Sequence, residues 1–151
     1  TNDIVWNSDN RNVVGVRIIL TYSEDETSNG VGCAAPGASQ PDPDTITGTI
    51  THGDFNGTGS GENQGQGSSS HEILVEWYNS SLYLSGNASG MSESQIINEL
   101  DSMGEGLGAY LLEINVDAES GNAFQCNHTD NGEEVEYVVE VVLLDYEITP
   151  T

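Results

Sequence analysis

The chain has 151 residues, with 25 acidic side chains against two arginines and no lysine, so its formal net charge is −23. A polyanion of this strength repels nucleic-acid phosphates and lacks the basic cluster that binds anionic lipid surfaces. No apolar run approaches the ~20 residues that a membrane helix needs. We therefore expect neither nucleic-acid binding nor membrane insertion, and the length predicts a single domain over residues 1–151.

Apolar residues gather in strand-length blocks, which argues for a folded chain in spite of the high net charge. Val13–Tyr22 is apolar on both faces, a pattern typical of a central strand. Thr45–Thr51 alternates threonine with isoleucine or glycine, which predicts a strand with one buried face. Residues 29–44, between these two strands, are rich in Gly, Pro and Ala and are predicted to form a loop.

The segment 53–70 is rich in Gly, Ser, Gln and Asn. We predict a long flexible loop there, because such residues do not pack a core. Ile73–Tyr78 and Ser81–Ser85 follow as short apolar runs, and the polar pair between them, Asn79 and Ser80, predicts the turn of a hairpin.

One short α-helix is predicted at about residues 92–103. Ser92 and Gln95 have the spacing of a capping box, in which each side chain bonds the other residue's backbone N–H. Ile96 and Leu100 then mark one helical face, and two glycines shortly after them predict the end of the helix.

Two further strands complete the pattern. Leu107–Asp117 alternates apolar and polar residues, and Glu133–Thr149 does the same with its glutamates outward. The second run changes phase near Leu143 and Leu144, which predicts a bulge or bend at that point. The whole pattern predicts a mainly β fold, an antiparallel β-sandwich-like domain with one short α-helix.

The two cysteines, Cys33 and Cys126, match no metal-binding or redox spacing. We predict that they form a disulfide, which would close a loop of about 94 residues. Two unpaired thiols in a reducing cytosol are the alternative. Because disulfides persist in oxidising compartments, the pair favours an extracellular or cell- or virion-surface location.

Four Asn-X-Ser/Thr sequons are candidates for glycosylation, although their number is barely above what chance gives for this composition. Their asparagines are Asn56, Asn79, Asn87 and Asn127. Such sites are expected on the surface of an extracellular protein.

One acidic segment matches the front half of an EF-hand-type calcium loop, D-x-[DN]-x-[DN]-G. The oxygen ligands would be Asp54, Asn56, Thr58 and Glu62. The match departs at the fifth position, which is Thr58, and at the twelfth, where Gly65 replaces a bidentate glutamate. Bound Ca²⁺ is therefore a hypothesis beside the simpler interpretation of a loop with two acids, and we expect no other cofactor.

No catalytic motif is evident in the chain. The three histidines, His52, His71 and His128, lack a metal-binding spacing and are predicted to be solvated loop residues. Carboxylates are so abundant that some pair will reach the spacing of a glycosidase by accident. We therefore expect no enzyme activity.

The near-absence of cations is more unusual than the number of acids, because charged residues make up only 18% of the chain. Concentrated salt screens the repulsion among exposed carboxylates, and bound calcium neutralises them locally. The missing lysines, together with acids spread along the chain, favour a protein of a salt-adapted organism.

These observations predict an extracellular structural protein, without catalysis, of a salt-adapted organism or its virus. It would be a subunit of a surface filament, coat or virion and would assemble with copies of itself. Within residues 1–12, the apolar Ile4, Val5 and Trp6 precede a polar linker, and we expect them to dock on a neighbouring subunit. They could instead form an edge strand of their own domain. The alternative function is a secreted, calcium-assisted carbohydrate-binding or adhesion module.

The net charge predicts that stability depends on ionic strength. The melting temperature should rise between about 0.05 M and about 2 M NaCl, because the Debye length falls to ~3 Å near 1 M salt. Chloride suits this measurement, since sulfate also strengthens apolar burial. Equal melting temperatures in the two solutions would contradict the salt-adapted interpretation.

Overall fold

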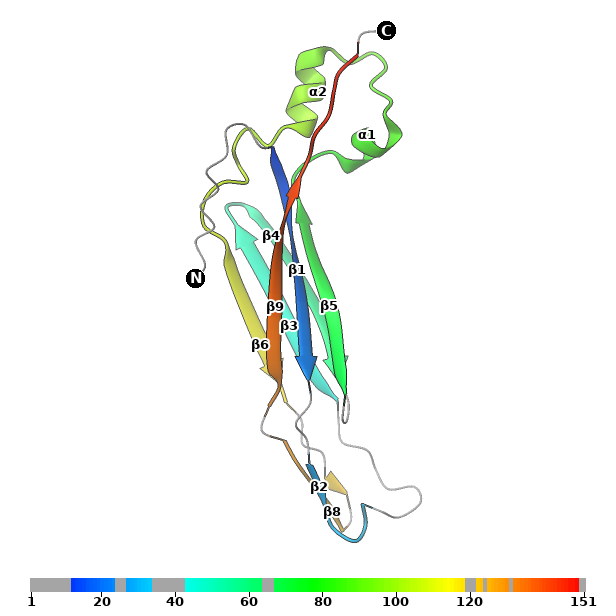
Figure 1. Cartoon of the computed structure of the whole chain (residues 1–151), viewed down its shortest axis with the longest axis vertical. Coiled ribbons are helices and arrows are strands. Elements are labelled where there is room, and N and C mark those ends of the chain that lie inside the picture. The colour runs from blue at the N-terminus through cyan, green and yellow to red at the C-terminus, as the bar shows by residue number, and fades with distance from the viewer. Residues whose placement is uncertain are drawn as a thin grey trace.

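The computed structural model describes residues 12–23, 27–33, 43–63, 67–118, 122–123, 125–130 and 132–149. Its body consists of two antiparallel three-stranded sheets that face each other (Figure 1). One sheet contains, in spatial order, β5 (Ser68–Glu76), β1 (Val13–Ser23) and β9 (Glu134–Leu143). The other contains β4 (Phe55–Asn63), β3 (Asp44–His52) and β6 (Leu111–Asp117). The predicted mainly β, sandwich-like fold is confirmed.

Two smaller parts extend the sandwich at its ends (Figure 1). The helix end contains α1 (Ser80–Ser85), α2 (Glu93–Leu100) and the C-terminal segment 144–149. The tip, at the opposite end, is a small sheet of β2 (Thr27–Asn29), β8 (Cys126–Thr129) and β7 (Asn122–Ala123), in that spatial order.

β1 and β3 are the central strands, as their sequence patterns predict. β1 pairs with both β5 and β9, and its inward-facing Val16, Ile18 and Leu20 are at most 2% exposed. Ile46 and Ile50 of β3 face them and are at most 1% exposed. These side chains form the centre of the sandwich core.

Most of the segment 53–70, predicted to be a flexible loop, is instead strand, in β4 and the start of β5. The glycines of β4 explain the difference, because Gly57, Gly59 and Gly61 occupy the face that meets the other sheet. A Cβ on Gly57 would collide with Val75, and one on Gly59 would lie 3.0 Å from the Ile73 side chain. The glycines of this low-complexity sequence therefore give β4 an inner face without side chains, which lets β4 lie close against β5.

α2 confirms the predicted helix, and its capping box is present as expected. The Ser92 side chain accepts the N–H of Gln95, and the Gln95 side chain accepts the N–H of Ser92. The helix ends at Leu100 rather than near residue 103. Ile96 and Leu100 are the buried residues on its inner face.

α1 corrects the predicted hairpin, because residues 81–85 are helical rather than extended. The Asn79 side chain accepts the N–H of Leu82 at 2.9 Å and caps the first turn. Gly86 adopts the left-handed conformation, with φ of 62°, and ends the helix. The pair predicted to form a turn, Asn79 and Ser80, thus begins a helix.

A bulge where β1 meets the end of β9 separates two apolar clusters. The pairing register shifts between Val13 and Gly15, opposite the end of β9, so Val14 is an extra residue. Val14 is fully buried and packs with Leu144 and α2 in a second cluster at the helix end. The single long strand predicted over Glu133–Thr149 is wrong: β9 ends at Leu143, and the extra residue lies on β1 rather than within β9.

The close β4–β5 contact makes a stability prediction. Gly57→Ala should lower the free energy of unfolding by roughly 1–3 kcal/mol, because the new methyl group overpacks the contact with Val75. Gly67→Ala is the matched control, since a Cβ there meets nothing within 4 Å. Urea unfolding in concentrated NaCl measures both, and equal stabilities of the two variants would contradict the close packing.

Candidate functional site

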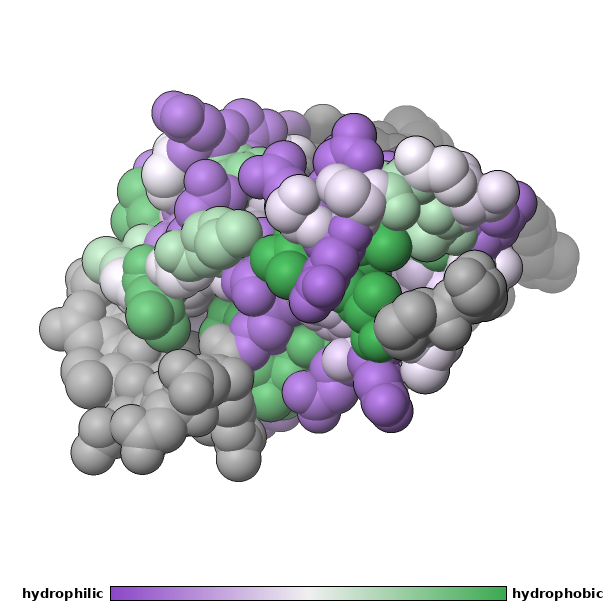
Figure 2. Space-filling view, turned by 90° about the horizontal axis from the view of Figure 1, so that it is seen from above, coloured by the Kyte–Doolittle hydropathy of each residue, from purple (hydrophilic) through white to green (hydrophobic). Residues whose placement is uncertain are grey.

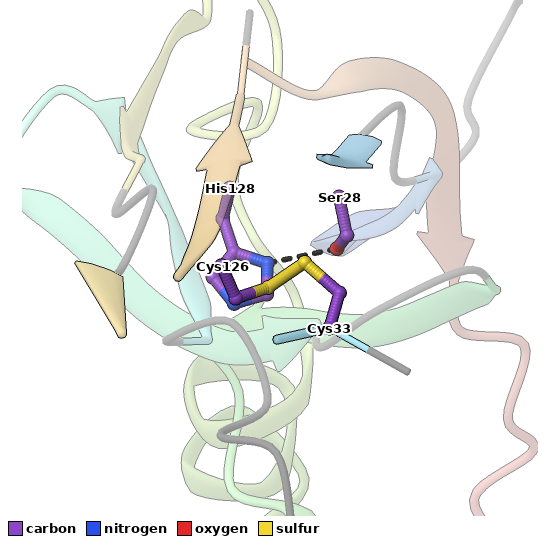
Figure 3. Close-up of a disulfide and its surroundings, with 4 residues drawn as sticks. All are labelled: Ser28, Cys33, Cys126 and His128. Atoms are coloured by element: carbon purple, nitrogen blue, oxygen red, sulfur yellow. Dashed lines mark hydrogen bonds between the residues drawn. A yellow bond between two sulfur atoms is a disulfide. The ribbon is translucent and has the colours of Figure 1, made fainter. Parts of the chain in front are cut away.

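The tip is held by the predicted disulfide, which is confirmed. Cys33 and Cys126 are joined, with their Cα atoms 4.8 Å apart. Figure 3 shows His128 beside the bond, with Nδ1 2.8 Å from the Ser28 hydroxyl oxygen and Nε2 3.5 Å from the Cys126 sulfur. Cys126 and His128 are at most 5% exposed, whereas Ser28 is exposed and Cys33 half-buried. The group is therefore a cross-link between β8 and the chain around β2 that is buried on the β8 side.

The histidines are not the solvated loop residues that the sequence predicted, because His52 and His128 are both at least nine-tenths buried. The His52 ring stacks on Tyr110 at a centroid distance of 4.0 Å. Its nitrogens face the carbonyl oxygens of Ala109, at 2.9 Å, and Glu105. His52 therefore joins the end of β3 to the segment that leads into β6. Among the described residues, no group of three His, Cys, Asp or Glu side chains is placed to hold a metal ion.

The four proposed calcium ligands do not surround a common point. Asn56, Thr58 and Glu62 lie on the exposed face of β4, whereas Asp54 is in the turn before it. A strand rises about 3.3 Å per residue, so Asn56 and Glu62 are separated by roughly 20 Å. An EF-hand loop instead curls around its ion. The predicted calcium-loop conformation is therefore wrong: Asn56, Thr58 and Glu62 belong to an edge strand, and Asp54 belongs to the turn before it.

All four sequon asparagines are exposed, on three different parts of the fold. Asn56 and Asn127 are on β4 and β8. Asn79 caps α1 and also donates to the Glu99 carboxylate at 2.8 Å. Asn87 lies between the helices, and its side-chain oxygen accepts the N–H of Ser89 at 3.2 Å. All four are thus accessible on the surface of the fold, and their glycosylation stays a prediction.

A buried polar cluster lies where the sandwich meets the tip. Asn63, 4% exposed, donates from its side-chain amide to the Glu133 carboxylate at 3.0 Å and accepts from the Ser69 hydroxyl at 3.2 Å. The Tyr22 hydroxyl oxygen lies 3.3 Å from Nδ1 of His71. Burial is the main cause that raises the pKa of Tyr22, and the negative charge of Glu133 adds to it. The cluster ties the ends of β1, β4, β5 and β9 together.

The helix end carries a hollow of about 320 Å³. Figure 2, viewed from this end, shows hydrophobic residues gathered at the middle of the face among polar ones. Glu147 is the one carboxylate among the lining residues, and Tyr83, Tyr146 and Thr149 also belong to the lining, so the hollow is mixed rather than purely apolar. The apolar lining includes Leu82, Tyr83, Ile96, Leu100, Tyr146 and Ile148.

The side of the sandwich opposite the β4–β5 contact is less completely covered. Since β4 lies against β5, the other edge strands, β6 and β9, share the opposite side. Within the described residues, each pairs with a single strand of its main sheet. Buried core side chains of β1, β3 and β5 are at most 7% exposed. By contrast, the inward-facing side chains of the edge strands β6 and β9 are only partly buried. They are Leu112, Ile114, Val116, Val135 and Val139.

We call this side the β6–β9 opening. Tyr137 of β9 pairs with the buried Leu20 and faces inward, yet it is 47% exposed. Of the ten exposed large apolar side chains in the described residues, six lie on β6, on β9 or in the segment before β6. They are Met103, Leu107, Leu111, Tyr137, Val138 and Leu143. Apolar surface is therefore concentrated along these segments.

Exposed acids flank the opening, on the outward faces of both edge strands. They are Glu113, Asp117, Glu134 and Glu136. Arg17, the one arginine among the described residues, lies farther in, on the outer face of β1. Its side chain donates to Glu140 at 2.7 Å, and this hydrogen bond, with the charges of Glu140 and Glu72, raises the pKa of Arg17.

The predicted interface residues Ile4, Val5 and Trp6 lie outside the described residues. The first described residue, Asn12, is held by hydrogen bonds to three other residues. Asn12 donates from its side-chain amide to the Leu100 carbonyl at 2.6 Å and accepts the N–H of Ser102 at 2.8 Å. Its carbonyl accepts the N–H of Leu144 at 3.0 Å. Asn12 is thus fixed between the segment that leads to β6 and the one that follows β9.

No known protein family, curated protein or solved structure matches this chain. None of the helices in the described part of the chain is long and apolar enough to cross a membrane. Sequence reasoning missed the β6–β9 opening, since an edge strand is recognised only once the order of strands in both sheets is known.

Breaking the disulfide should loosen the tip before the sandwich, because the sandwich has the large apolar core and the tip does not. The double variant Cys33→Ser/Cys126→Ser should lose roughly 4–5 kcal/mol of stability if loop closure accounts for the effect. Limited proteolysis with mass mapping should find the first new cuts within residues 27–33 or 125–130. First cuts inside β1 or β3 would contradict this order.

Proposed function

We propose that this chain is an extracellular structural protein of a salt-adapted organism or its virus. It would act without catalysis, as a subunit that assembles with copies of itself into a surface filament, coat or virion. The observation that carries the proposal is the β6–β9 opening, where two strand edges and their partly buried inward side chains lie on one side of the sandwich. Such edges are templates for pairing with another chain.

Two other features support an extracellular and salt-adapted setting. The disulfide between Cys33 and Cys126 is of a kind that persists in oxidising compartments. The net charge of −23 makes any association of two copies unfavourable at low ionic strength and tolerable in concentrated salt. Assembly of this chain would therefore be coupled to the salt content of its surroundings.

The proposal predicts salt-dependent assembly that requires the apolar N-terminal residues. The full chain should form large particles in about 2 M NaCl and remain a monomer in about 0.05 M NaCl. Deleting residues 1–6 should abolish assembly with little change in melting temperature, because under this proposal Ile4, Val5 and Trp6 pack on a neighbouring copy rather than on their own domain. Light scattering and negative-stain microscopy measure the particles.

Deleting residues 1–3 alone is the matched control, since it keeps Ile4, Val5 and Trp6. This shorter deletion should still assemble. A full chain that stays monomeric in concentrated salt would contradict the structural function and favour a secreted binding module instead. A longer deletion that unfolds would place the segment in its own core.

A further inference from the structure

We propose that Asn87 is the sequon at which the folded chain carries an N-linked sugar. Such a modification requires only that the chain be secreted, and it is independent of self-assembly. All four sequon asparagines are exposed, so exposure alone does not distinguish them. They differ in whether a transferring enzyme can reach the asparagine amide and the hydroxyl two residues later at the same time.

Asn87 lies in a tight turn that leaves both of these groups open. Its side-chain oxygen accepts the N–H of Ser89 at 3.2 Å, which forms an Asx turn and brings the two ends of the sequon together. Gly86 and Gly90, with φ of 62° and 80°, let the chain turn on either side. Within the described part of the chain, the amide nitrogen of Asn87 and the hydroxyl of Ser89 make no hydrogen bond.

The side chain of Asn79 is engaged at both ends. Its oxygen accepts the N–H of Leu82 at 2.9 Å, and its nitrogen donates to the Glu99 carboxylate at 2.8 Å. A sugar on this nitrogen would crowd the carboxylate of Glu99. Modification at Asn79 would therefore work against the cap of α1.

The other two sequons lie in strands, where the backbone is extended and the tripeptide does not curl. Asn127 is on β8, the central strand of the tip, and is paired on both sides. Asn56 is on β4, and the hydroxyl of Thr58, two residues later, lies 3.1 Å from that of Thr49. Either strand would have to leave its sheet before the sequon could adopt a turn.

There is room for a sugar beside Asn87. A larger hollow, of about 820 Å³, adjoins the one described above, and Asn87 and Ser89 both belong to its lining. Ile96 and Ile148 line both hollows. The C–H groups of a sugar ring are apolar, so the first ring would lie against these isoleucines while its hydroxyls stay in water.

The modification is a group transfer from a sugar attached to a lipid phosphate. The amide nitrogen of Asn87 forms a bond to the anomeric carbon of the sugar, and the bond from that carbon to the phosphate oxygen breaks. The phosphate leaves with the bonding electron pair, and one amide proton passes to a base of the transferring enzyme. The product keeps the side-chain oxygen of Asn87, so the Asx turn is preserved.

Secretion of the full chain from a salt-loving archaeal host that N-glycosylates its own surface proteins tests the site. Peptide mass spectrometry measures the sugar occupancy of each asparagine. As a reference, each sequon with its flanking residues is secreted within an unstructured Gly/Ser-rich linker, in a host that modifies all four. Relative to this reference, Asn87 should keep its occupancy in the folded chain. The other three should fall by roughly tenfold or more, because their strands or cap must first open.

A pair of variants checks the geometry. Ser89→Ala removes the hydroxyl of the Asn87 sequon but keeps the backbone N–H that holds the turn. It should abolish the modification and leave the melting temperature of the sugar-free chain unchanged. Thr58→Ala, which removes the hydroxyl of the Asn56 sequon, is the matched control and should leave the total sugar content unchanged.

The outcomes separate this inference from the proposed function. Occupancy retained at Asn87 and lost at the other three sequons supports it. An empty Asn87, or occupancies that match the reference at all four sequons, overturns it. None of these measurements involves assembly. A chain that carries the sugar at Asn87 but stays monomeric in concentrated salt therefore overturns the proposed function alone.

Discussion

The distance between the two sheets is set differently on the two sides of the sandwich, and the other features follow from this difference. On one side, Gly57, Gly59 and Gly61 remove the side chains that would keep β4 away from β5. On the other side, branched side chains such as Ile114 and Val139 pack against the core and are only partly buried. A close-packed core needs atoms to fill the wider side, and among the described residues only partly buried side chains supply them.

The charges of the chain act on the same wider side. Acids on the outward faces of β6 and β9 give both edges a negative border, a common device against unwanted strand pairing. In dilute salt this border opposes the approach of another polyanion, and in concentrated salt it is screened. Arg17, on β1, forms ion pairs with Glu72 of β5 and Glu140 of β9. Among the described residues, no arginine pairs with the acids that border the opening.

The strands with side chains of alternating polarity could be predicted from the sequence, and so could the disulfide and the capping box of α2. β4 could not, because an alternation of glycine with polar residues has no apolar signal, although its inward face is buried by contact. The same lack of an apolar signal in β4 led to the hypothesis of a calcium loop with Asp54 and Glu62 as ligands. α1 was missed because Leu82 and Leu84 have the spacing of a strand, whereas Asn79 and Gly86 were its true start and stop signals. The β6–β9 opening depends on strand order, which one sequence does not contain.

The position of β1 determines how the domain would respond to mechanical tension. Asn12 leads directly into β1, which is hydrogen-bonded to β5 on one side and to β9 on the other. A pull on the N-terminal segment along the axis of β1 loads these bonds in shear, because ladder hydrogen bonds run perpendicular to the strands. Bonds loaded in shear must break together, whereas bonds at the end of a hairpin can open one after another. Force transmitted from a neighbour would thus enter the domain through the strand with the most bonds to resist it.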